Sequence, residues 1–212
     1  MQILAVIFPP VLFLNSPYLL LGLVASVILA WGMLWLRNNT WKDVGFRKPD
    51  HMGRLVLITL IATAILFPLS TFAIQAIKAF TGQTPNLEAF EAIRGNLHAL
   101  VAGLVVAWIF GAFLEEFLFR GFLLNTFHEL LSKEGNPKWV AWTGAVVGTS
   151  VLVGVGHLYQ GIVGMMGTGL IAVGFSVIYL INQRNLWSCI LAHGLYNTVA
   201  FVLVYNGMVL YP

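Results

Sequence analysis

Long apolar segments separated by short polar stretches make up most of this 212-residue chain. A helix rises 1.5 Å per residue, so about 20 apolar residues cross the ~30 Å hydrocarbon core of a bilayer. Lipid cannot satisfy an open sheet edge, and such spans must therefore be helical. The pattern predicts an all-α, polytopic transmembrane bundle of six to eight helices, forming a single integral membrane domain over residues 1–212. The six expected spans are residues 18–36, 55–80, 97–131, 139–157, 162–182 and 187–210.

The N-terminal apolar segment, residues 2–14, is too short to span comfortably and is interrupted by Pro9-Pro10. We expect it either to enter the membrane and turn back or to form a kinked first helix. It has no basic region and no small-residue cleavage site, so we interpret it as part of the mature protein rather than as a signal peptide.

Composition supports the membrane interpretation. Hydrophobic residues make up 59% of the chain and charged residues only 9%, whereas soluble domains are roughly a quarter charged. A fold of this size could not bury so much apolar surface without lipid around it, so membrane lipids are expected partners. Cys189 is the single cysteine, which excludes an internal disulfide.

The positive charges follow membrane topology. The net charge of +3 is small and indicates no nucleic-acid partner. With alternate crossings, three basic loops fall on one side, which the positive-inside rule assigns to the cytoplasm. The loop at residues 81–96 then faces outward. The basic residues of these three loops are Arg37, Lys42, Arg47, Lys48 and Arg54 in the first, Lys133 and Lys138 in the second, and Arg184 in the third.

Three charged residues lie inside an otherwise apolar helix, in the segment GLVVAWIFGAFLEEFLFRGFLL. A charge near the bilayer centre costs from ~3 to ~15 kcal/mol, so it is tolerated only beside a partner or a polar cavity. Glu116 and Arg120 are four residues apart and can pair on one helix face. Glu115 points about 100° away and remains free for chemistry. The simpler alternative is an ion pair that only orients helices.

Two further apolar segments carry imidazoles. His157 follows the apolar run ending in VLVGVG, and Gly154 and Gly156 are expected to let another helix approach closely. His193 and Asn197 are four residues apart and share a helix face. If every segment crossed fully, His157 and His193 would lie at different depths. We therefore expect either strongly tilted spans or a helix that begins inside the membrane near the glycine-rich residues 158–170.

The ordered set EEFLFR (Glu115 to Arg120), GHLYQG (with His157) and HGLYN (His193 to Asn197) is more specific than its parts. It resembles the CAAX protease and bacteriocin-processing (CPBP, or Abi) family of intramembrane glutamic endopeptidases, which includes the Ras-converting CAAX prenyl endopeptidases. The family pattern is EExxxR, FxxxH and HxxxN on consecutive transmembrane helices. Val153 replaces the phenylalanine of the second motif. The resemblance places a catalytic core at residues 97–200.

The resemblance implies a role for each of these residues. Glu115, together with His157, would activate a water molecule, and Glu116 and Arg120 would hold that pair in position. His193 and Asn197 would stabilise the oxyanion. The implied substrate is a peptide or protein, lipidated or not: a membrane-associated or prenylated CAAX-type protein, or a bacteriocin-like peptide. The resemblance implies no cofactor and no metal ion, and the expected location is a bacterial cytoplasmic membrane.

Three alternatives remain open on the sequence. Glu115, His157 and His193 could form a two-histidine, one-carboxylate zinc site of a metallopeptidase, although no HExxH spacing is present. Intramembrane Glu and His also mark proton-coupled transporters. The third alternative is a non-catalytic immunity or scaffold protein.

Overall fold

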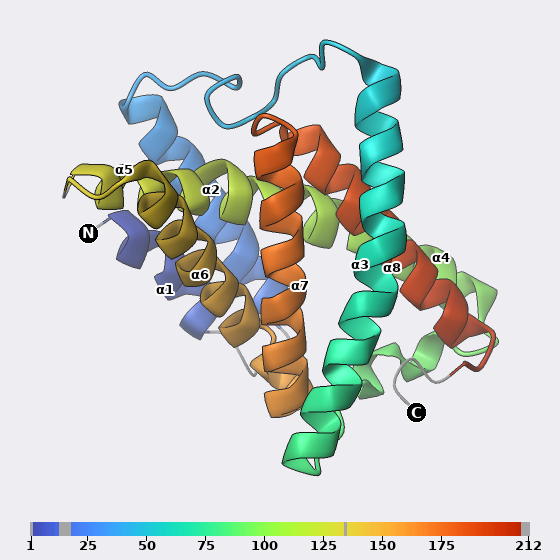
Figure 1. The fold of residues 1–212 in the computed structure, drawn as a ribbon. Helices are drawn as coiled ribbons and strands as arrows, with labels where there is room; N and C mark the ends of the chain where they lie inside the picture. Colours follow the sequence, from blue (N-terminus) through green and yellow to red (C-terminus); the bar gives the residue numbers. More distant parts are fainter. Residues whose placement is uncertain (1, 13–17, 134, 209–212) are drawn as a thin grey trace.

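The computed structural model describes residues 2–12, 18–133 and 135–208. These residues form eight α-helices and no strand, which confirms the all-α prediction. Six helical segments among them are long and apolar enough to cross a membrane, which confirms a multi-pass integral membrane protein. In chain order the α-helices are α1 (Gln2–Leu12), α2 (Leu19–Leu36), α3 (Met52–Thr81), α4 (Leu97–Val106), α5 (Asn125–Lys133), α6 (Lys138–Gly156), α7 (Gly161–Ile181) and α8 (Leu186–Tyr205), as Figure 1 shows.

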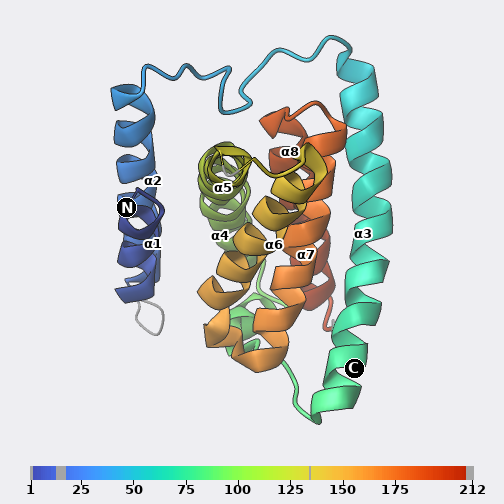
Figure 2. The same ribbon diagram turned by 60° about the vertical axis from the view of Figure 1, so that its left-hand side comes forward.

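The N-terminal segment forms a short helix against α2. Helix α1 contains Pro9 and Pro10 and is only 11 residues long, which corresponds to about 16 Å and is too short to span. The Ser26 hydroxyl on α2 donates a hydrogen bond to the Val6 carbonyl at 2.6 Å. Figure 2 shows the α1–α2 pair at one edge of the molecule. The segment is thus a short first helix, while residues 13 and 14 of the predicted range lie outside the described residues.

One continuous helical segment of 37 residues, Leu97–Lys133, crosses the bundle obliquely between α4 and α5 (Figure 1). At roughly 50 Å it is much longer than the hydrocarbon core is thick, and tilt accommodates the excess. Between its ends lie two stretches of π-helix, η2 (Ala107–Glu115) and η3 (Phe117–Leu124). Such wider turns are rare and are frequently found at functional sites. This oblique helix, one of the two outcomes expected from the sequence, carries the first motif.

Helices α6 and α7 form a close antiparallel pair. A Cβ atom at Gly154 would lie 2.6 Å from the Met165 carbonyl oxygen, so only glycine permits this approach. The prediction for Gly154 is confirmed, whereas the one for Gly156 is wrong, because its Cβ would meet nothing within 4 Å. His157 ends α6, and a single 3-10 turn, η4 (Leu158–Gln160), leads directly into α7.

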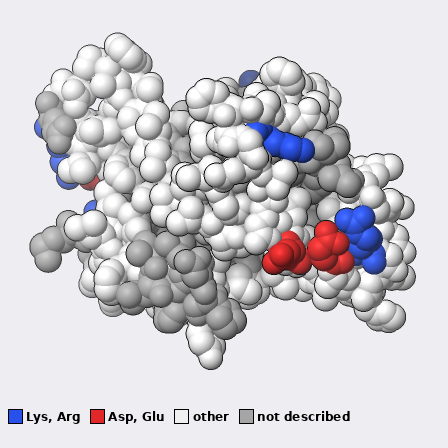
Figure 3. Space-filling view, turned by 90° about the horizontal axis from the view of Figure 1, so that it is seen from below, with Lys and Arg blue, Asp and Glu red and all other residues white. Residues whose placement is uncertain are grey.

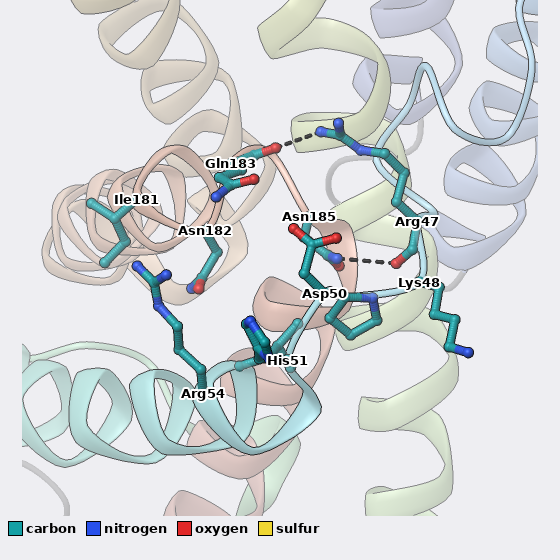
Figure 4. Close-up of a pocket in the computed structure, with 11 residues that line it drawn as sticks. Arg47, Lys48, Asp50, His51, Arg54, Ile181, Asn182, Gln183 and Asn185 are labelled. Carbon is teal, nitrogen blue, oxygen red and sulfur yellow. Dashed lines mark hydrogen bonds between the residues drawn. The ribbon is translucent and has the colours of Figure 1, made fainter.

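The polar segment before α3 is docked onto the turn between α7 and α8. Gly45 adopts φ +101°, and its carbonyl accepts a hydrogen bond from the Leu186 amide at 2.8 Å. The Arg47 guanidinium donates to the Gln183 carbonyl, and the Asn185 amide donates to the Arg47 carbonyl at 3.0 Å (Figure 4). These bonds fix the start of α8, the helix that carries the third motif.

The outer surface of the bundle is apolar. Phe72 of α3 is 71% exposed and Val151 of α6 is 59% exposed. Large apolar side chains can remain this exposed because the surrounding lipid is as apolar as they are. The buried core instead gathers around η3, α7 and α8 and includes Phe122, Leu123, Leu124, Phe175, Ile178 and Ile190.

Candidate active site

A cavity of about 550 Å³ lies inside the bundle, between the oblique helix and α6, α7 and α8. Five of the six candidate residues line it: Glu115, Arg120, His157, His193 and Asn197. Two helical segments, the oblique helix and α8, and the end of α6 therefore converge on one space. The difference in depth expected between His157 and His193 does not keep them apart, because both side chains reach this cavity.

The sixth candidate, Glu116, is fully buried behind the wall of the cavity. Its Oε1 atom accepts hydrogen bonds from Arg120 Nη1 at 3.0 Å and from His193 Nδ1 at 2.8 Å. Arg120 is itself 2% exposed, and its Nη2 donates to the Ala172 carbonyl on α7 at 2.8 Å. One carboxylate thus joins the oblique helix, α7 and α8 in a network of charge-assisted bonds, which are shorter and stronger than neutral ones.

These contacts differ from the expectation that Glu116 and Arg120 hold Glu115 and His157 in place. Within the described chain, Glu116 and Arg120 bond to each other, to His193 and to the Ala172 carbonyl. The physical reason is the turn of the helix. Successive side chains diverge by about 100°, so the face that carries Glu116 and Arg120 meets α7 and α8, while Glu115 turns into the cavity.

Phe175 on α7 packs against two members of this network, His193 and Arg120. Its ring stacks on the His193 imidazole, with centroids 4.7 Å apart and planes inclined at 20°. The Arg120 guanidinium carbon lies 5.6 Å from the same ring centroid, within the range of a cation–π contact. This role could not be predicted, because Phe175 is one apolar residue among many on an apolar helix.

The His157 ring is oriented by the backbone of its own helix. Its Nδ1 lies 2.9 Å from the Val153 carbonyl oxygen, which can only accept, so Nδ1 carries a proton. A neutral ring in this tautomer has no proton on Nε2. Nε2 is then left with a lone pair. The Tyr159 ring stacks beside the imidazole at a centroid distance of 5.8 Å. Tyr159 also lines the cavity, although it is not among the residues predicted from the sequence.

Close packing between η2 and α8 places His193 and Asn197 at the cavity. A Cβ atom at Gly111 would lie 3.2 Å from Asn197 Nδ2 and 3.7 Å from His193 Nε2. One turn away, a Cβ at Gly194 would lie 2.4 Å from the Trp108 ring. The two glycines allow η2 and α8 to touch, so the polar tips of His193 and Asn197 lie against the π-helical backbone rather than in lipid.

Glu115 occupies a different environment from its neighbour. It is partly exposed to the cavity, and it makes no hydrogen bond or ion pair with any other described residue. Asn197 likewise makes no side-chain hydrogen bond within the described part of the chain. A carboxylate and an amide that line one cavity without partners among the described residues are available to a bound molecule.

No group of three or more His, Cys, Asp or Glu residues, among those the structure describes, is arranged to hold a metal ion. Glu115, His157 and His193, the ligands of the zinc alternative, all line the cavity without forming such a group.

Residues 96–199 match the family model of the type II CAAX prenyl endopeptidase Rce1-like proteins. These residues therefore form an Rce1-like domain. The matched segment contains all six candidate residues. It also contains Ala172 and Phe175, which contact Arg120 in the network described above. No curated protein and no solved structure matches the chain.

This match supports a CAAX-type intramembrane protease, and hence a hydrolase that acts on a peptide or protein. The one visible departure from the motif pattern, Val153, lies in the cavity wall. Its contribution to His157 is a backbone carbonyl, which any residue supplies. The departure therefore alters packing and leaves the hydrogen bond to the imidazole intact.

Proposed function

We propose that this protein is a glutamate-dependent intramembrane endopeptidase that hydrolyses a peptide bond of a membrane-associated protein or peptide, lipidated or not. The observation that carries the proposal is the position of Glu115. It is a carboxylate without a protein partner among the described residues, in a cavity whose other walls carry His157, His193 and Asn197. Such a cavity can hold a water molecule and a peptide carbonyl together.

In the proposed reaction, the Glu115 carboxylate removes a proton from water. The oxygen of that water attacks the scissile carbonyl carbon and forms a tetrahedral oxyanion. Glu115, now protonated, transfers its proton to the departing amide nitrogen as the C–N bond breaks. The products are a carboxylic acid and an amine, so atoms and charge balance without a cofactor. General acid–base transfer of this kind contributes about 10²–10⁴-fold to the rate.

His157 is proposed to orient the attacking water. Because Nδ1 is bound to the Val153 carbonyl at 2.9 Å, the lone pair on Nε2 can accept a hydrogen bond from that water. Glu115 would then take the other proton. Two acceptors hold the water in one orientation, which lowers the entropic part of the barrier.

His193 and Asn197 are proposed to donate to the oxyanion. His193 already donates from Nδ1 to Glu116 at 2.8 Å, so donation from Nε2 requires the doubly protonated ring. The buried Glu116 carboxylate stabilises that cation. With Glu115 and Glu116 negative and Arg120 and His193 positive, the four groups are neutral together. During the reaction the negative charge moves from Glu115 to the oxyanion, where each well-placed donor in a dry site supports it by about 3–4 kcal/mol.

The direct test compares the wild type with Glu115→Gln and Glu115→Ala, purified in detergent, on a fluorogenic peptide library that includes farnesylated CAAX peptides. The matched control is Glu129→Gln on α5, a carboxylate of the same oblique helix that is exposed and remote from the cavity. We expect cleavage by the wild type and by the control only, insensitive to chelators. Equal cleavage by Glu115→Ala would show that the assignment of the base is wrong. Inhibition by chelators that zinc reverses would instead support a metallopeptidase.

A further inference from the structure

The cavity reaches one particular face of the bundle. From Glu115 and His193 it extends to the loop between α3 and α4, where Ala89 and Ala92 are exposed and also line it. It continues to the last turns of α8 at Phe201 and Val204. We call this side, formed by residues 82–96 and the end of α8, the cavity face. Among the described residues, none from 37–51, 135–137 or 182–185 lines the cavity.

The opposite side carries most of the positive charge. Eight of the eleven Lys and Arg residues lie in or directly beside the connections α2–α3, α5–α6 and α7–α8: Arg37, Lys42, Arg47, Lys48, Arg54, Lys133, Lys138 and Arg184. We call this side the basic face. Figure 3, seen from the side of the cavity face, shows few charged side chains there. Its 3-10 helix η1 (Glu88–Ile93) carries two acids, of which Glu91 is paired with Arg94.

This asymmetry fixes the orientation. Short loops rich in Lys and Arg stay on the cytoplasmic side of a membrane. The basic face is therefore cytoplasmic, and the cavity face is not. Because the two faces are on opposite ends of the same helices, a molecule that enters the cavity along its lining residues arrives from the non-cytoplasmic side.

We propose that the substrate is a peptide segment presented at the non-cytoplasmic surface of the membrane, and not a cytoplasmic protein tail. The inference rests on the proposed endopeptidase function. The residues toward the mouth are small or apolar, and include Ala89, Ala92, Ala99, Ala102, Gly103 and Val106. A wall of this kind accommodates apolar side chains and gives no ion-pair partner. The expected cleavage site is therefore flanked by apolar residues.

The mouth is held in place by its own backbone. The Asn86 amide donates to the Gln160 carbonyl at 2.8 Å, which ties the loop to the turn beside His157. The Gly95 amide donates to the Tyr205 carbonyl at 3.0 Å, which ties the loop to the end of α8. The loop thus connects the two sides of the cavity entrance. The route from the cavity face to His157 is therefore fixed by backbone hydrogen bonds of the fold.

Orientation is tested first by cysteine labelling. The wild type supplies the background, because its single cysteine, Cys189, is fully buried. Thr84→Cys places an exposed thiol on the cavity face, and Gly53→Cys places one near the basic face, where a Cβ meets nothing within 4 Å. In sealed right-side-out vesicles, a membrane-impermeant maleimide should label Thr84→Cys directly and Gly53→Cys only after permeabilisation. The reverse pattern would overturn the inference.

Access is tested with a charged, impermeant fluorogenic peptide added outside sealed vesicles. We expect right-side-out vesicles to cleave it roughly tenfold or more faster than inside-out vesicles, since a charged peptide does not cross the bilayer. Detergent should abolish the difference. A reversed ratio with normal activity in detergent overturns this inference alone. Absence of cleavage by the wild type in detergent would overturn the proposed function and, with it, this inference.

The third test narrows the cavity entrance with a bulky side chain and measures peptide cleavage. Ala102→Trp places a large ring in the cavity wall, whereas Val101→Trp places it one residue away, at an exposed position outside the lining. Obstruction of the reactive geometry should reduce cleavage by roughly tenfold or more for Ala102→Trp only. Equal activities of the two folded variants would overturn the entry path.

Discussion

Removing Arg120 alone should destabilise the protein more than any other single charge change. The variant Arg120→Met keeps most of the side-chain volume and deletes the guanidinium. It removes the 3.0 Å bond to Glu116 and the 2.8 Å bond to the Ala172 carbonyl. The carboxylate left behind is fully buried and, among the described residues, retains only His193 as a donor.

The size of the effect follows from these two bonds. A hydrogen bond to a charged group contributes about 1.5–3 kcal/mol, so two contribute about 3–6 kcal/mol. Breaking a buried ion pair by deleting one partner costs about 3–5 kcal/mol, which agrees. The double variant Arg120→Met/Glu116→Gln also removes the buried carboxylate charge that Arg120 compensates, and it should recover roughly 2 kcal/mol of that loss.

Thermal unfolding in one detergent measures these differences. For a chain of this size we expect Tm to fall by about 6–20 °C in Arg120→Met. Lys133→Met is the matched control, because Lys133 and Glu129 form an exposed ion pair with the same i,i+4 spacing. It should cost less than about 0.5 kcal/mol. If Arg120→Met were as stable as the control, or if the double variant were the least stable, the buried network would not have the energetic role assigned to it.

Three further predictions follow from single contacts. Asn197→Ala should lower kcat/KM by about 10²–10³-fold in the peptide assay while leaving Tm unchanged, and an unchanged kcat/KM would remove Asn197 from the oxyanion site. Gly194→Ala should cost about 1–3 kcal/mol in thermal unfolding, because its Cβ would lie 2.4 Å from the Trp108 ring; wild-type stability would contradict that packing. Hydrogen bonds from the Thr40 amide and hydroxyl lower the pKa of Asp43 from its ordinary 3.8. Asp43 therefore stabilises its loop above about pH 4 and loses that effect as the pH falls through its lowered pKa. Proteolysis of the loop between α2 and α3 at pH 5 and pH 3 should show this dependence in the wild type and not in Asp43→Asn.

Much of the fold follows from hydropathy. The six apolar segments predicted the six spans, since a run of about 20 apolar residues has few alternatives to a membrane helix. A hydropathy profile does not predict how a helix is tilted within the membrane. The oblique course of Leu97–Lys133 and its π-helical turns depend on packing against α8, through Gly111 and Gly194, and a hydropathy profile does not record such contacts. The division into one membrane domain with a catalytic core at residues 97–200 stays a prediction.

The candidate residues could be found because charges and imidazoles are conspicuous in an apolar sequence. Most of the residues that they contact could not be predicted in this way. Helix periodicity predicts that Glu116 and Arg120 pair, and they do. It cannot predict that His193, 77 positions away in the chain, also bonds to Glu116. Phe175 and the carbonyls of Ala172 and Val153 also escaped prediction, because an apolar ring or a backbone oxygen has no distinctive signal in a sequence.

The adjacent glutamates have different possible roles because their surroundings differ. Arg120 and His193 both contact Glu116, so the buried carboxylate has the compensation that a charge in low dielectric requires. Glu115 has no such neighbour among the described residues, and its negative charge must be balanced across the cavity. Whatever binds there should therefore be neutral or positive beside Glu115. Water and a peptide bond satisfy that requirement, whereas a carboxylate product does not. Charge repulsion between Glu115 and the new carboxylate would favour product release, and the same group that begins the proposed reaction would help to end it.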